Sequence, residues 1–79
     1  MAEAPTVDLT LDCKGMLCPM PIVKLAKAMK EMESGQVVLM MATDPGAVPD
    51  VEAYAKNTGN PILSQDKDGS VMRFWIQKA

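Results

Sequence analysis

The stretch Leu17-Cys18-Pro19-Met20-Pro21 joins a strand-like segment to a long amphipathic helix pattern. Proline suits the first position of a helix, because the N–H that it lacks has no partner there, so we expect the helix to begin at Pro19. The Cys18 thiol then lies at a helix N-terminus, where unpaired N–H groups and the helix dipole favour the thiolate. Pro21 also lacks an N–H, so the free donor nearest the sulfur is expected to be the N–H of Met20. The stretch predicts a rigidly held, reactive sulfur; the alternative is a small apolar cysteine packed in a strand-to-helix turn.

The segments around this stretch predict the element order β-α-β-α-β-β. Residues 7–12 alternate apolar and polar side chains, which is typical of a half-buried strand, and residues 36–43 form the apolar run of a central strand. Residues 61–66 and 70–77 are two further strands, joined by a hairpin at the Asp-Gly pair 68–69. Apolar side chains at helical spacing predict one helix from residue 19 and a shorter one over about residues 48–58. The expected core positions of the helices are Ile22, Leu25, Ala26, Met29, Met32, Val51, Tyr54 and Ala55.

Two short helices can cover only one face of a four-stranded sheet. Each crossover connection is right-handed, so both helices are expected on the same face, which leaves the other face open. In the last strand, Met72 and every second residue after it should point to the helices, while Arg73 and Trp75 should lie on the open face. An exposed Trp75 beside apolar neighbours suggests a docking surface; the alternative is that it shields the edge of the sheet.

Length and composition limit the function classes. The 79 residues predict a flexible tail over residues 1–6 and a single domain over residues 7–79. The start of the chain has no signal-peptide pattern, and the longest apolar run is too short to span a bilayer, so we expect a cytoplasmic protein and no membrane contact. A net charge of −2 without a basic block argues against direct nucleic-acid binding. The chain has no histidine and two cysteines, so neither Cys-His catalysis nor a metal site is expected.

The stretch from Leu11 to Pro21 resembles the signature of the TusA family, the SirA-like sulfur-carrier proteins. The similar features are Leu11-Asp12, the glycine at Gly15 and the Cys-Pro-x-Pro motif at residues 18–21, and Thr43-Asp44-Pro45 also matches. The resemblance extends over roughly residues 9–78. It implies an α/β (α+β) two-layer sandwich with a four-stranded mixed sheet and two helices on one face.

The resemblance also implies a function. By this resemblance Cys18 would be the catalytic residue of a sulfurtransferase and would carry sulfane sulfur as a persulfide, supported by the motif residues Asp12, Gly15, Pro19, Met20 and Pro21. A donor protein, a cysteine desulfurase or a rhodanese, loads the thiol, and a DsrE-like acceptor receives the sulfur. Such relays serve tRNA thiolation, molybdenum cofactor synthesis or sulfur oxidation. No cofactor is needed, because the donor cleaves the carbon–sulfur bond, and a monomer or weak dimer is expected.

Cys13 is a second thiol at a position that the family does not fix. It could form a disulfide with Cys18, carry a second sulfur, or simply pack as a small residue at the end of the first strand. The first possibility gives an alternative function, a dithiol redox switch, and a further alternative is a non-catalytic interaction module that binds through the open sheet face. Three lysines on the first helix, Lys24, Lys27 and Lys30, form either an ordinary solvated face or a patch that steers acidic partners.

Overall fold

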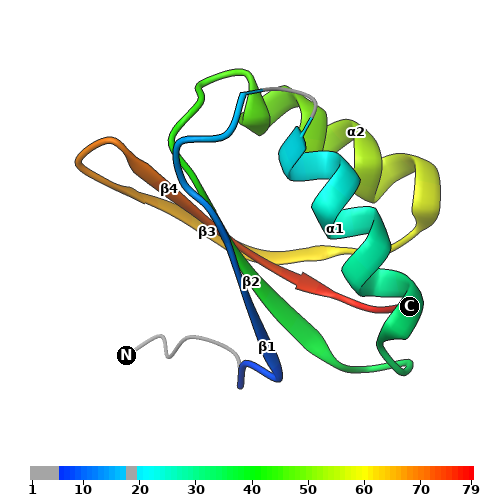
Figure 1. The fold of residues 1–79 in the computed structure, drawn as a ribbon. Coiled ribbons are helices and arrows are strands. Elements are labelled where there is room, and N and C mark those ends of the chain that lie inside the picture. Colours follow the sequence, from blue (N-terminus) through cyan, green and yellow to red (C-terminus); the bar gives the residue numbers. More distant parts are fainter. Residues whose placement is uncertain (1–5, 18–19) are drawn as a thin grey trace.

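The structure is a computed structural model that describes residues 6–17 and 20–79 of the chain (Figure 1). The predicted element order is confirmed, with most boundaries within two residues of the expected ones. Residues 1–5 of the predicted tail, and Cys18 and Pro19, lie outside the described residues. The elements are β1 (Leu9–Cys13), α1 (Met20–Glu31), β2 (Val37–Ala42), α2 (Ala47–Thr58), β3 (Ile62–Asp68) and β4 (Val71–Gln77).

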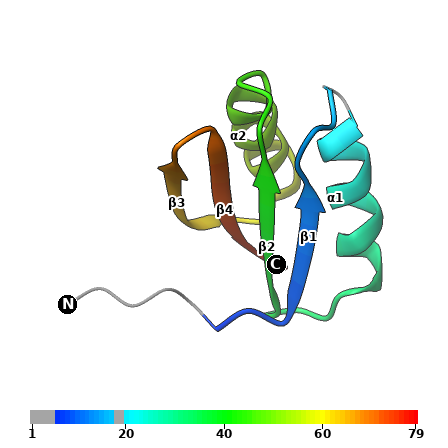
Figure 2. The same ribbon diagram turned by 60° about the vertical axis from the view of Figure 1, so that its left-hand side comes forward.

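The four strands form one mixed sheet in the order β1-β2-β4-β3, which Figure 2 shows from the side of the strands. β1 pairs with β2 in parallel, as a β-α-β crossover requires, and the other two pairs are antiparallel. Both helices lie on one face of this sheet (Figure 1). The two-layer sandwich is therefore confirmed, with β1 and β3 at the edges.

The core lies between the helices and the sheet, and α1 enters it with a stripe at helical spacing. Pro21, Leu25 and Met29 follow one another at intervals of four residues, which places them on one face, and all three are buried. They pack toward alternate strand residues such as Met40 and Phe74, both completely buried. In the described part of the chain, neither helix has the length and apolar character needed to cross a membrane.

β3 and β4 are joined by the predicted hairpin. Asp68 pairs with Val71, so Gly69 and Ser70 form a two-residue loop. Gly69 has a φ of 62°, and glycine at the first loop position with positive φ fits a type II′ turn, whose twist matches that of the strands. The hairpin sets one register for β3 and β4 from the Asp68–Val71 pair to the Ser64–Trp75 pair, and the register shifts between Ser64 and Ile62.

Trp75 lies on the open face as predicted, but it is only 6% exposed, so the expectation of an exposed tryptophan is wrong. β4 is an interior strand, and Trp75 has Leu39 of β2 on one side and Ser64 of β3 on the other. The Arg73 guanidinium lies 5.4 Å from the centre of the indole ring and is held by two hydrogen bonds of 2.7 Å to Asp66. The ring does not shield an edge either, because β4 has a neighbour on both sides.

Candidate functional site

The loop after β1 leads the chain toward the Cys-Pro-x-Pro motif, and local hydrogen bonds fix its path. The Asp12 carboxylate accepts the Lys14 N–H at 3.0 Å, and the Cys13 carbonyl accepts the Met16 N–H at 3.2 Å. Gly15 has a φ of 79°, a left-handed conformation that a side chain disfavours. Asp12 and Gly15, both predicted from the motif, therefore shape the turn that precedes the cysteine.

A second loop holds the first one in place. The Gly15 N–H donates to the Thr43 hydroxyl at 2.9 Å, a contact between residues that are 28 positions apart. Thr43 directly follows β2, and the neighbouring Asp44 closes its own turn by accepting the Gly46 N–H at 3.1 Å. Parallel β1 and β2 end at the same edge of the sheet, which brings these two loops together. The sequence identified Thr43-Asp44-Pro45 as a motif but did not predict that Thr43 anchors the Gly15 loop.

Removing this anchor has a predictable cost. Thr43→Val keeps the shape of the side chain but deletes the acceptor of the Gly15 N–H, so we expect a loss of about 0.5–1.5 kcal/mol of stability. Sulfur transfer should also slow, because the loop before Cys18 loses its fixed position. The measurement pairs thermal unfolding with the rate of persulfide formation. Thr10→Val, at an exposed position of β1, is the matched control, and equal behaviour of the two variants would contradict the role of Thr43.

The start of α1 differs from the prediction in one respect. The Met20 N–H is not a free donor, because it donates to the Leu17 carbonyl at 2.9 Å. Sequence spacing identified Met20 only by elimination, since its neighbour Pro21 has no N–H, and missed this short-range bond. Helix α1 begins at Met20, two residues after Cys18.

Pro21 has a packing role that the sequence did not predict. Its ring is completely buried, one helical turn before Leu25 and on the same face. A proline near the start of a helix was expected to set backbone geometry and to withhold an N–H. The structure gives it a third role, as the first buried residue of α1, on the helix face that carries Leu25 and Met29 into the core.

Pro21→Ala is therefore expected to cost stability as well as function. It removes two buried carbon atoms, worth about 1–2 kcal/mol at roughly 0.8 kcal/mol for each buried CH₂, and it gives the unfolded chain more freedom. Sulfur transfer should slow further, because the start of α1 is less firmly seated. Pro49→Ala provides the control, since Pro49 is also in the first turn of a helix but is exposed. Thermal unfolding and transfer rates of both variants test this, and similar losses in the two would contradict it.

The Cys13 thiol is sealed in the core. Its side chain is 0% exposed and belongs to the same buried cluster as Leu25 and Ala42. Burial raises the pKa of the Cys13 thiol, and the nearby Lys24 ammonium opposes this rise only in part. A protonated, inaccessible thiol is a poor nucleophile. Among the described residues, no three His, Cys, Asp or Glu side chains are grouped to hold a metal ion.

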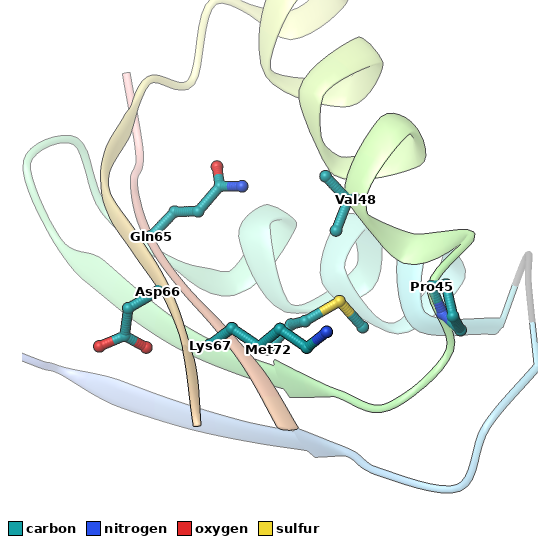
Figure 3. A pocket seen from close by; sticks show the side chains of 6 residues that line it. All are labelled: Pro45, Val48, Gln65, Asp66, Lys67 and Met72. Carbon is teal, nitrogen blue, oxygen red and sulfur yellow. The ribbon is translucent and has the colours of Figure 1, made fainter. Parts of the chain in front are cut away.

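A pocket of about 430 Å³ lies at the same end of the sheet, between the start of α2 and the β3–β4 hairpin (Figure 3). Pro45, from the loop that carries Thr43, forms one wall, and Val48 and Met72 add apolar surface. Asp66 points the other way, toward its ion pair with Arg73. The sequence did not predict this pocket, because its walls come together only through the strand order. The residues that line it are Pro45, Val48, Gln65, Asp66, Lys67 and Met72.

Known proteins are similar to this chain in sequence and in fold. The family model described as Sulfurtransferase TusA matches residues 9–78. YrkI of Bacillus subtilis is 51% identical over 71 residues, which cover 90% of this chain and 95% of YrkI. The sulfur carrier protein TusA of Allochromatium vinosum is 43% identical over 72 residues, 91% of this chain and 95% of that protein. The crystal structure of a SirA-like protein from Desulfitobacterium hafniense matches with a TM-score of 0.78 and 27% identity, covering 87% of this chain and 95% of that one. The similarity therefore extends over nearly the whole described domain.

Proposed function

The chain belongs to the TusA sulfurtransferase family, and from this premise we propose that it accepts sulfane sulfur as a persulfide on Cys18 and passes it to a partner protein. Membership supports a role as a sulfur carrier with donor and acceptor partners. We further propose a cysteine desulfurase or a rhodanese as the donor and a DsrE-like protein as the acceptor, in a cytoplasmic sulfur relay.

The burial of Cys13 is the observation that carries the assignment to Cys18. The chain has only two cysteines, and sulfur transfer needs a thiolate that a partner can reach. Cys13 is 0% exposed and its pKa is raised, so it meets neither condition. Cys18 follows Leu17, which is 75% exposed, and stands in the Cys-Pro-x-Pro motif directly before α1. These neighbours support an accessible sulfur at residue 18.

The transfer itself needs no cofactor. The Cys18 thiolate attacks the outer sulfur of the donor's persulfide, a new S–S bond forms on Cys18, and the donor's S–S bond breaks. The donor cysteine leaves as a thiolate with the electron pair of the broken bond, and the proton stays on the transferred sulfur. Oxidation states balance, since one thiol is restored as the other becomes a persulfide. In the second step the acceptor's thiolate attacks the outer sulfur of the Cys18 persulfide, the S–S bond on Cys18 breaks, and Cys18 leaves as a thiolate with the electron pair of that bond.

The burial of Cys13 also bears on the dithiol alternative. A disulfide with Cys18 would require the Cys13 sulfur to leave the core, where it packs at the end of β1 beside Ala42. Its raised pKa disfavours the thiolate that such a reaction needs. The structure thus favours the carrier over the switch, and it favours the packing role for Cys13 that the sequence left open.

Mass spectrometry of the intact protein distinguishes the candidate functions. After incubation with inorganic polysulfide, a sulfur carrier gains the mass of one or more sulfur atoms, loses it again on reduction, and carries the label on the peptide that contains Cys18. A dithiol switch instead loses two hydrogen atoms on oxidation, and an interaction module does neither. Either of the last two results would contradict the proposed function.

A further inference from the structure

Three large apolar side chains are exposed on the two sides of the Cys18-Pro19 dipeptide. Leu17 is 75% exposed, Met20 49% and Val23 53%, and we call these three residues the apolar patch. Met20 and Val23 are three residues apart in α1 and therefore share a face, and the bond from the Met20 N–H to the Leu17 carbonyl holds Leu17 next to them. Among the described residues, the other large apolar side chains of comparable exposure, on edge strands β1 and β3, are separate from this group.

Basic residues border the apolar patch on α1. Residues 13–30 contain four of the eight basic residues of the chain and none of the ten acidic ones, so a segment of charge +4 stands in a chain of net charge −2. Lys24 follows Met20 by four residues, and Lys27 follows Val23 by four, so each lysine borders the patch on α1 and is exposed. The charge of Lys24 reaches the end of β1, where it opposes the rise in the pKa of Cys13. The four basic residues are Lys14, Lys24, Lys27 and Lys30.

We infer that the apolar patch, bordered by Lys24 and Lys27, is the surface on which the sulfur-exchanging partner docks. Sulfur can pass only when the two sulfur atoms come within bonding distance, so the partner must cover the residues on both sides of Cys18. The surface fits a protein with an apolar depression around its own cysteine and carboxylates at the rim. The apolar contacts provide affinity, and the complementary charges raise the association rate. This inference rests on the proposed function and adds to it the chemistry of the partner.

The test compares a small sulfur source with a protein source on the same variants. Persulfide formation is measured with inorganic polysulfide and with a cysteine desulfurase that L-cysteine has charged, and the ratio of the two rates removes any change in the reactivity of Cys18. The ratio of protein-source to polysulfide rates should fall at least about tenfold in the Leu17→Ser/Val23→Ser double variant, as expected for the loss of interface anchors. Leu63→Ser, at an apolar residue of β3 that is 43% exposed, is the matched control and should keep the wild-type ratio.

A charge variant tests the contribution of Lys24 and Lys27 separately. In wild type, the rate from the protein donor should fall as salt is added, because salt screens the attraction between lysines and carboxylates. Lys24→Glu/Lys27→Glu should lower that rate about tenfold at low salt and abolish its decrease with salt, whereas Lys56→Glu at an exposed position of α2 should not. Thermal unfolding checks that all variants remain folded.

The outcomes separate the docking surface from the proposed function. An unchanged ratio in both double variants overturns the docking surface. The docking surface is also overturned if the wild type is loaded by polysulfide but neither by the desulfurase nor by a thiosulfate-charged rhodanese. It is overturned, too, if the patch substitutions dissociate a homodimer of this chain without slowing transfer from the protein donor. Failure of polysulfide to place sulfur on Cys18 of the wild type overturns the proposed function instead.

Discussion

Cys18→Ser is expected to abolish persulfide formation completely while the domain remains folded. A serine hydroxyl cannot accept sulfane sulfur as the thiolate does, so no residual carrier activity is expected from residue 18. Serine is also well tolerated at the N-terminus of a helix, where its oxygen can accept a backbone N–H. Mass spectrometry after polysulfide treatment measures the loss, and thermal unfolding measures the fold.

The buried thiol provides the control for this variant. Cys13→Ala removes the other sulfur from the core and should cost about 1 kcal/mol, on the order of one buried methylene-sized group. It should leave persulfide formation at Cys18 nearly intact. If Cys13→Ala is instead the variant that cannot be loaded, or if Cys18→Ser still gains sulfur, the assignment of the carrier thiol is wrong.

The two thiols of the native protein should differ in alkylation rate by at least about a hundredfold. Iodoacetamide reaches Cys13 only when the core opens, because this side chain is 0% exposed. A small domain with roughly 3–5 kcal/mol of stability is open in fewer than about one molecule in a hundred at any time. Cys18, between exposed Leu17 and the start of α1, should react directly. Peptide mapping after short exposure to the reagent reports the two rates.

The pH dependence of the two rates should differ in the same experiment. If the N-terminus of α1 favours the Cys18 thiolate, the rate at Cys18 should level off below the ordinary thiol pKa of about 8.5. Burial raises the pKa of Cys13, so the unfolded chain loses this proton at a lower pH than the native state does. The stability due to this thiol therefore falls as pH rises through the ordinary thiol range, and Cys13 should become more accessible there. Equal rates with equal pH profiles would contradict both the burial and the helix-terminus argument.

Helix and strand positions could be predicted because they depend on spacing within the segment itself. Leu25 and Met29 of α1, and Met72, Phe74 and Ile76 of β4, occupy the faces that their periodicity indicated. Pro21 was missed because proline was interpreted through its backbone alone. Its position one turn before Leu25 would have placed its ring in the same buried stripe.

The rest of the site depends on pairings between distant segments or on single short-range bonds. The Gly15–Thr43 hydrogen bond and the pocket beside Pro45 arise from the strand order, which the sequence does not encode locally. The exposure of Trp75 was misjudged for the same reason. The sequence does not show that β2 and β3 flank β4, so it does not show which side chains cover the indole ring. The Met20–Leu17 bond was missed for a different reason, because the helix pattern says nothing about how its first N–H is satisfied. Periodicity thus predicts which face a residue occupies, but not which neighbour covers it.

The position of Trp75 gives the molecule a spectroscopic reporter. It is the only tryptophan of the chain, and its indole lies under the Arg73 guanidinium. Because it alternates with the core residues Phe74 and Ile76, it lies on the sheet face opposite the helices. The fluorescence of Trp75 will change when the sheet unfolds, because unfolding exposes the indole ring to water. The Cys-Pro-x-Pro motif leads into α1 on the other side of the sheet, so sulfur loading should leave the emission unaltered. Unfolding can therefore be followed by tryptophan emission, and sulfur loading by mass spectrometry, on the same unlabelled sample.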